Sequence, residues 1–159
     1  MNRLRALTLS ALLMACAPGT IPGIVNFESQ ASHVTGRVDS PQDPPAGSAH
    51  NASWQNCGTY DRPLDDEYAV HSLEHGAVRT CTGRAAHPTR FSRRPAGSPR
   101  TLLSLPPDLR SLRVVAWNAR LHPDPATDPR PLRFILKARQ GSAAREAGQA
   151  CSGRSGETS

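Results

Sequence analysis

The residues best suited to chemistry lie in the stretch HSLEHG, residues 71–76, which places two histidines four positions apart. Glu74 directly precedes the second histidine, so His71, Glu74 and His75 follow the order H-x-x-E-H of the inverted zincin metallopeptidases. On a helix, His71 and His75 would share a face and lie close enough to bind one divalent metal ion. On a strand they would also share a face, with Glu74 turned away. Either arrangement needs a third ligand.

Three interpretations of this cluster are open from the residues alone. Imidazole and carboxylate groups together suit zinc or copper better than calcium or magnesium, so the first is a transition-metal site. The second is a buried hydrogen-bonded network in which Glu74 fixes the tautomer of a histidine. The third is a small metallohydrolase with Glu74 as general base, although no helix-borne acidic pair downstream supplies the further ligand of a zincin. We expect binding rather than catalysis, and no other catalytic residue is assigned.

The first 16 residues have the features of a bacterial lipoprotein signal. Arg3 and Arg5 precede an apolar run, residues 6–15, that is too short to span a bilayer. Leu13-Met14-Ala15-Cys16 resembles a lipobox, in which Cys16 is acylated and becomes the mature N-terminus. The sequence thus predicts export to the cell envelope and a membrane contact through a lipid anchor, at the outer membrane if the cell has one. The alternative is a plain signal peptide and a secreted protein.

An exported domain can form disulfides. Apart from Cys16 the chain has Cys57, Cys81 and Cys151, an odd number, so one disulfide and one free thiol are the simplest arrangement.

The net charge of +6 conceals two halves of opposite charge. Residues 16–78 hold two arginines and eight acids, whereas residues 79–159 hold fifteen basic residues and five acids. The change is sharpest at residues 79–100, which contain six arginines, no acid and no periodic apolar pattern. An exported protein without a nucleic-acid-binding motif is not expected to bind nucleic acid. The segment is either a basic arm for anionic lipid or a stretch read out of frame from GC-rich DNA.

The remaining patterns predict an α+β fold, a single small domain with a few short strands, a long ordered Pro/Gly loop and one C-terminal helix. Residues 17–32 are expected to form a tether, 33–142 the domain and 143–159 a Gly/Ser-rich tail. Strands are predicted at 33–38 and 112–121. The pattern over 67–78 fits a helix or a strand.

The C-terminal helix is predicted within residues 125–141. Asp128 is expected at its N-cap and Pro129 at its first position, and Gly141 ends it. Leu132, Ile135 and Leu136 fall on one face, which we expect to be buried. The large aromatic residues elsewhere, Trp54, Tyr60 and Trp117, are expected to pack in the core or under loops.

The chain resembles an uncharacterised bacterial family, domain of unknown function family 3105. The family's motifs are Pro-Pro…His, Trp, Gly-x-Tyr-Asp-x-Pro and Val-His-Ser-Leu-Glu-His-Gly-Ala-Val, followed later by Ala-Trp-Gly. The positions of this chain that match them are Pro44, Pro45, His50, Trp54, Gly58, Tyr60, Asp61, Pro63, residues 70–78, Ala116 and Trp117. Gly47-Ser48 replaces the family's Ser-Gly, Asn118 replaces its glycine, and residues 79–100 match nothing in it.

The resemblance implies two further assignments. His50 ends the family's other specific motif, so it becomes the third candidate ligand beside His71 and His75, with Glu74 as fourth ligand or as a group that orients them. The mismatch over 79–100 sets Cys81 apart as the free thiol and leaves Cys57–Cys151 as the disulfide. The resemblance itself implies no activity.

Overall fold

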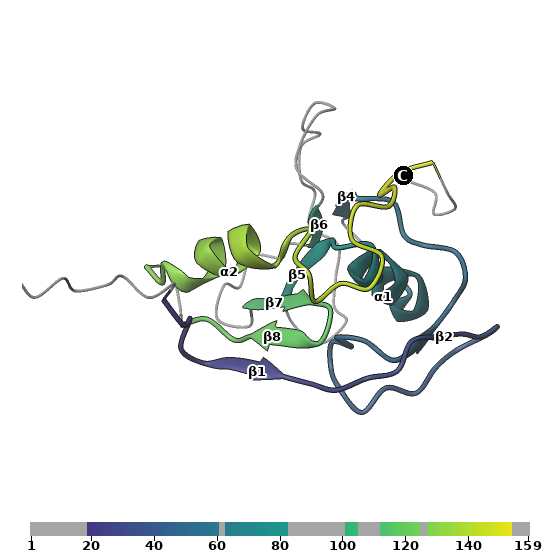
Figure 1. Ribbon diagram of the computed structural model, residues 1–159, viewed down its shortest axis with the longest axis horizontal. Helices are drawn as coiled ribbons and strands as arrows, with labels where there is room; N and C mark the ends of the chain where they lie inside the picture. The colour runs from purple at the N-terminus through teal and green to yellow at the C-terminus, as the bar shows by residue number, and fades with distance from the viewer. Residues whose placement is uncertain (1–18, 61–62, 83–100, 105–111, 125–126, 154–159) are drawn as a thin grey trace, which may run out of the picture.

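The computed structural model describes residues 19–60, 63–82, 101–104, 112–124 and 127–153. They form one α+β domain, as predicted, with a six-stranded sheet, a two-stranded sheet and two helices (Figure 1). The larger sheet has the order β1-β8-β7-β5-β6-β4. Its strands are β1 (Ile24–Asn26), β4 (Gly58–Tyr60), β5 (Val78–Thr82), β6 (Thr101–Ser104), β7 (Leu112–Ala116) and β8 (Ala119–Leu121). No helix in these ranges is long and apolar enough to cross a membrane.

Strand β7 carries side chains to both faces of the sheet, and each face has its own core. Val114 packs with Phe134 of the C-terminal helix on one face. Val115, the next residue, packs with Leu73 of the first helix on the other. Both valines have no exposed surface. Because successive side chains of a strand point to opposite faces, the pair Val114-Val115 joins the two cores through a single strand.

The strand predicted over 112–121 is wrong in one respect, because it is interrupted by a turn. Strands β7 and β8 form an antiparallel hairpin in which Ala116 pairs with Ala119. The two residues between them are Trp117 and Asn118, and Asn118 has a φ of 57°. Asparagine tolerates this left-handed conformation better than other non-glycine residues, which explains how it replaces the glycine of the family motif.

The first helix, α1 (Asp66–Glu74), resolves the ambiguity over residues 67–78 in favour of a helix followed by a strand. Asp66 and Glu67 lie in its first turn, where the helix dipole favours negative charge. Gly76 follows its end with a φ of 86°, and a Cβ there would lie 3.0 Å from the backbone of Gln140. The helix therefore ends at a position that both the backbone angle and the close contact reserve for glycine.

The second helix, α2 (Arg130–Ala138), is the predicted C-terminal helix. The predicted start is wrong by one residue: Pro129, not Asp128, occupies the N-cap, and Asp128 accepts a hydrogen bond from the backbone N–H of Arg130 at 2.8 Å. The predicted buried face is wrong for two of its three residues: Leu132 is 63% exposed and Leu136 56%, whereas Phe134 is buried. The helix contacts the sheet mainly through Phe134, with Ile135 and Ala138 at the edge of that contact.

The limits of the domain are wider than the sequence indicates. Residues 17–32 are not only a tether, since β1 pairs with β8 along the edge of the main sheet. Residues 143–151 are not a loose tail, since Ala144 and Cys151 are buried and the backbone N–H of Glu146 donates to Glu74 O at 3.0 Å. Both segments gain hydrogen bonds and apolar contacts that composition alone does not reveal.

The segment 79–100 was expected to be anomalous, but its first four residues form part of a regular strand. Residues 79–82 belong to β5, which pairs with β7 on one side and β6 on the other. Arg79 is buried and its Nη1 lies 2.5 Å from Asp66 Oδ1 at the start of α1. Residues 83–100 lie outside the described residues, as do residues 1–18 with the expected signal and Cys16.

Candidate metal site

Helix α1 supplies the central residues of the candidate site. His71, Glu74 and His75 are spaced three and four positions apart, so they lie on neighbouring positions of one helical face. All three are buried, with exposed fractions of 3%, 4% and 4%. Burying such polar side chains is costly unless they have hydrogen-bond or ionic partners, so the contacts of these three residues show how their burial is compensated.

The small sheet supplies two more histidines. Strands β2 (Ser32–His33) and β3 (Ala49–His50) pair in parallel, and His33 is the register partner of His50. The ring centroid of His50 lies 5.1 Å from that of His33 and 5.0 Å from that of His71. His50 has no exposed surface, whereas His33 is exposed. The two strands thus bring a buried and an exposed imidazole to the side of α1.

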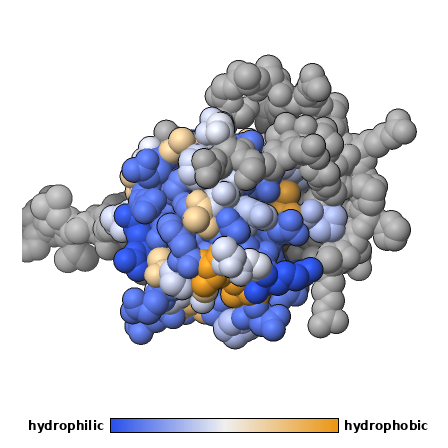
Figure 2. Space-filling view, turned by 90° about the vertical axis from the view of Figure 1, so that its right-hand side faces the viewer, coloured by the Kyte–Doolittle hydropathy of each residue, from blue (hydrophilic) through white to orange (hydrophobic). Residues whose placement is uncertain are grey.

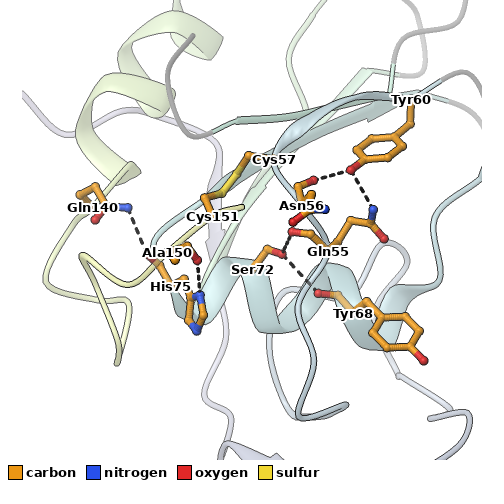
Figure 3. The surroundings of a disulfide bond; sticks show 10 residues. All are labelled: Gln55, Asn56, Cys57, Tyr60, Tyr68, Ser72, His75, Gln140, Ala150 and Cys151. Carbon is orange, nitrogen blue, oxygen red and sulfur yellow. Dashed lines mark hydrogen bonds between the residues drawn. A yellow bond between two sulfur atoms is a disulfide. The ribbon is translucent and has the colours of Figure 1, made fainter. Parts of the chain in front are cut away.

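The buried histidines share one orientation, because each directs its Nδ1 atom at a backbone carbonyl. The partners are Ser48 O for His50 at 2.8 Å, Asn51 O for His71 at 2.7 Å and Ala150 O for His75 at 2.7 Å (Figure 3 shows the last). A carbonyl oxygen only accepts, so in each ring Nδ1 carries the proton. Each Nε2 atom is then a lone-pair donor, unless the ring gains a second proton.

The Nε2 atoms face one another and the nearby carboxylates. His71 Nε2 lies 3.0 Å from His75 Nε2. His50 Nε2 lies 2.9 Å from Glu74 Oε2, yet it makes no hydrogen bond of acceptable geometry. Two unprotonated Nε2 atoms only 3.0 Å apart would repel each other, so the contact between His71 and His75 requires a proton or a metal ion between the two nitrogens.

Electrostatics favour the neutral form of the central histidine. Burial is the main cause that lowers the pKa of His71, and the positive charges that His75, His50 and His33 would carry lower it further. The hydrogen bond to Asn51 O opposes this shift. A neutral imidazole is the form that can ligate a metal, so the lowered pKa keeps His71 in a form that could coordinate an ion near neutral pH.

The potential ligand atoms fall into two groups that share one residue. The four-residue set is His33, His50, His71 and Glu74, and the three-residue set is His71, His75 and Glu146. Within each set the ligand atoms lie within 4.8 Å of one another. Nitrogen ligands about 2.0–2.1 Å from a tetrahedral zinc ion are about 3.3 Å apart, so small adjustments of side chains would complete either set.

The structure divides the predicted ligands between these sets. His50, His71 and Glu74 come together in the four-residue set, while His75 belongs to the three-residue set with His71. Sequence reasoning missed His33 and Glu146. His33 ends β2, and only its parallel pairing with β3 brings it to His50. Glu146 lies in the segment that was expected to be a tail.

Two tryptophans and a disulfide enclose the cluster. Trp54 packs on His75 with ring centroids 4.9 Å apart, and Trp117 packs edge-on against His50 at 5.9 Å. Cys57 and Cys151 are joined as a disulfide with Cα atoms 5.3 Å apart (Figure 3). This bond fixes the segment that carries Ala150, the hydrogen-bond partner of His75. Cys81 is the free cysteine among the described residues.

Charged groups at the edge of the cluster connect it to solvent. Glu146 Oε2 lies 3.3 Å from His75 Nε2, and the Glu146 side chain is 46% exposed. Arg145 Nε lies 3.8 Å from Glu74 Oε1. The surface on the α1 side of the molecule is mostly hydrophilic, with a small hydrophobic patch (Figure 2). Charged side chains thus lie at the edge of the cluster.

Comparison with known proteins identifies the family and nothing more specific. No curated protein and no solved structure matches the chain. One family model matches residues 33–153, which include strand β3, both helices and both sets of candidate ligands. Since this match covers well over half of the chain, the protein belongs to the family described as "Protein of unknown function (DUF3105)".

Proposed function

We propose that the domain binds one transition-metal ion, zinc or copper, in the four-residue set. The observation that carries this proposal is the common orientation of His50 and His71, the two buried histidines of that set. Both direct Nδ1 at a backbone carbonyl, which is the usual way of orienting histidine ligands. Nε2 of each ring is the atom left for a ligand, and His50 Nε2 makes no hydrogen bond. Three imidazoles and a carboxylate form a donor set that suits zinc or copper.

A second candidate is a purely structural network, favoured by the contact between His71 and His75. If His75 were doubly protonated, its Nε2 could donate to His71 Nε2, and Glu146 would balance the charge at 3.3 Å. This candidate leaves His50 Nε2 without a hydrogen bond. It also places the positive charge of a doubly protonated His75 beside His71, and the pKa of His71 is already lowered by burial and by the neighbouring histidines.

A metallohydrolase remains a third candidate, and the position of Glu74 counts against it. A general base must have an oxygen free to take a proton from a metal-bound water. Glu74 Oε2 instead lies 2.9 Å from His50 Nε2, and its other oxygen faces Arg145. Glu74 is therefore better placed to bind or orient than to act as base.

We also propose that the protein is exported and held at the membrane by acylation of Cys16. The support is the sequence of residues 1–16. A disulfide between Cys57 and Cys151 fits an oxidising compartment. Metabolic labelling with a fatty acid should mark the wild-type protein and leave a Cys16→Ser variant unmarked. Equal labelling of both would rule out this anchor.

The metal proposal is tested by measuring metal content with mass spectrometry on the purified protein after loading with Zn²⁺ or Cu²⁺. We expect about one ion per chain, lost in His71→Ala and strongly reduced in His50→Ala. The control is His122→Ala, which removes an exposed histidine outside both sets and should retain the ion. Circular dichroism checks that each variant is folded. A folded wild-type protein that retains neither metal would favour the structural network.

A further inference from the structure

We infer that the metal ion loads and leaves through the three-residue set, with His71 bound throughout, and rests in the four-residue set. The inference rests on the proposed metal binding. It assigns Glu146 a function as a transient ligand, distinct from the ligands that set the affinity.

The first step concerns His71, which belongs to both sets but can serve only one at a time. Its Nδ1 is held by Asn51 O at 2.7 Å, so Nε2 is its single available donor atom. Two ions cannot share one lone pair, and the two sets therefore exclude each other. An ion bound to His71 can nevertheless pass from one set to the other without leaving that nitrogen.

The second step concerns the number of ligands in each set. The four-residue set can complete a tetrahedral coordination sphere, as in closed structural sites. The three-residue set leaves one position of a tetrahedral ion open for water or for a ligand from outside. Ligand exchange with an external donor or acceptor needs such an open position. The three-residue set is thus suited to transfer and the four-residue set to retention.

The third step concerns exposure. Glu146 is 46% exposed, whereas the Glu74 side chain is 5% exposed. Glu146 Oε2 already lies 3.3 Å from His75 Nε2, and its backbone N–H donates to Glu74 O at 3.0 Å. The backbone of Glu146 is therefore anchored to α1, and its carboxylate lies at the surface next to the buried imidazole of His75, which contacts His71. A direct approach past the exposed His33 is the competing route.

The experiment measures zinc exchange in the full-length protein and in two variants, Glu146→Gln and His33→Ala. Loading is followed after mixing with Zn²⁺, and release after adding a chromophoric zinc chelator. We expect Glu146→Gln to slow loading and release together by about tenfold, with the dissociation constant unchanged. His33→Ala should weaken binding by about tenfold or more, because it removes a ligand of the resting site. The matched control is Glu28→Gln, another exposed glutamate, which should behave as wild type.

Each outcome has a distinct meaning. Wild-type rates in Glu146→Gln would overturn the loading route while leaving the metal site intact. Weaker binding and faster release in that variant would make Glu146 a resting ligand and would also overturn the inference. A His33→Ala variant with slower exchange and unchanged affinity would favour the competing route past His33. A wild-type protein that binds no zinc or copper would contradict the proposed function itself.

Discussion

Helices α1 and α2 are both nine residues long, but they are buried to very different extents. In α1 seven residues are buried, among them the polar residues Glu67, His71, Ser72 and Glu74. In α2 only Phe134 is buried. A helix that stabilises a domain needs only an apolar stripe, as in α2. A helix that buries a histidine and two glutamates is constrained by more than stability, and α1 is therefore the helix that carries the candidate site.

The largest expected effect on stability comes from removing the disulfide between Cys57 and Cys151, which lies on the same side of the sheet as α1. The disulfide closes a loop with a sequence separation of 94, so Cys57→Ser/Cys151→Ser should lower the free energy of unfolding by about 4–5 kcal/mol in the chain-entropy model. Urea unfolding measures it. The control is Cys81→Ser, which removes the free thiol and should cost about 1 kcal/mol or less. Equal losses in both variants would contradict a stabilising role for the disulfide.

The contrast within α2 gives the next largest effect. Phe134→Ala should lower the free energy of unfolding by about 3–5 kcal/mol, because it leaves a cavity against Val114 and Leu121. Leu136→Ala, at a site that is 56% exposed, should change it by about 0.5 kcal/mol or less. Thermal or urea unfolding of the two variants makes the comparison. A larger loss for Leu136→Ala would mean that the helix is rotated relative to the structure described here.

A gain in stability is expected near His50, at a position where backbone angle and side chain conflict. Ser48 has a φ of 97°, which suits glycine, the residue that the family motif has at this point. Ser48→Gly should raise the free energy of unfolding by about 1 kcal/mol and keep the carbonyl that orients His50. Gly47→Ser should instead destabilise, since a Cβ there would collide with Ser29 Oγ and lie 2.9 Å from Asn118 Oδ1. No gain in Ser48→Gly would show that the strain is absent.

The smallest expected effect is a pH dependence of the metal-free protein. Burial lowers the pKa of His71, and burial followed by the charges of Arg120 and Arg113 lowers that of His122. Below the ordinary value of 6.5 the unfolded chain therefore binds protons that the folded chain does not. Stability should be greatest above that pH and should fall as the pH drops below it. Urea midpoints in EDTA at about pH 7.5 and about pH 5.5 measure this. A higher midpoint at the lower pH would contradict it, and His122→Gln should retain the part that is due to His71.

The two helices also differ in how well sequence patterns predict them. Helix α2 has clear signals in Asp128, Pro129 and Gly141, but the identity of its buried face depends on the side chains of the sheet, which select Phe134 over the neighbouring leucines. Helix α1 is buried on most sides, so its apolar residues show no helical period. The turn at Trp117-Asn118 contains no glycine or proline and was hidden within an apolar run.

The candidate site was predictable as far as local sequence determines it. HSLEHG places His71, Glu74 and His75 together through the regular geometry of a helix. His33 and Glu146 lie in segments distant from this stretch, and only tertiary contacts bring them to it. The division into two sets also depends on the ring orientations of His50, His71 and His75, which contact backbone carbonyls and which no sequence pattern encodes.

The parallel pairing of β2 with β3 has a consequence for the order of folding. Such a pairing needs a connection that loops back, and the 15 residues between the end of β2 and the start of β3 supply it. The last ligand segment, at Glu146, joins from the far end of the domain. A site assembled from such distant parts forms late, because each part adds a loop-closure entropy that only the complete structure repays. If the domain binds a metal ion as proposed, loading should therefore follow folding rather than guide it, and an ion present before folding would meet the same histidines in other combinations.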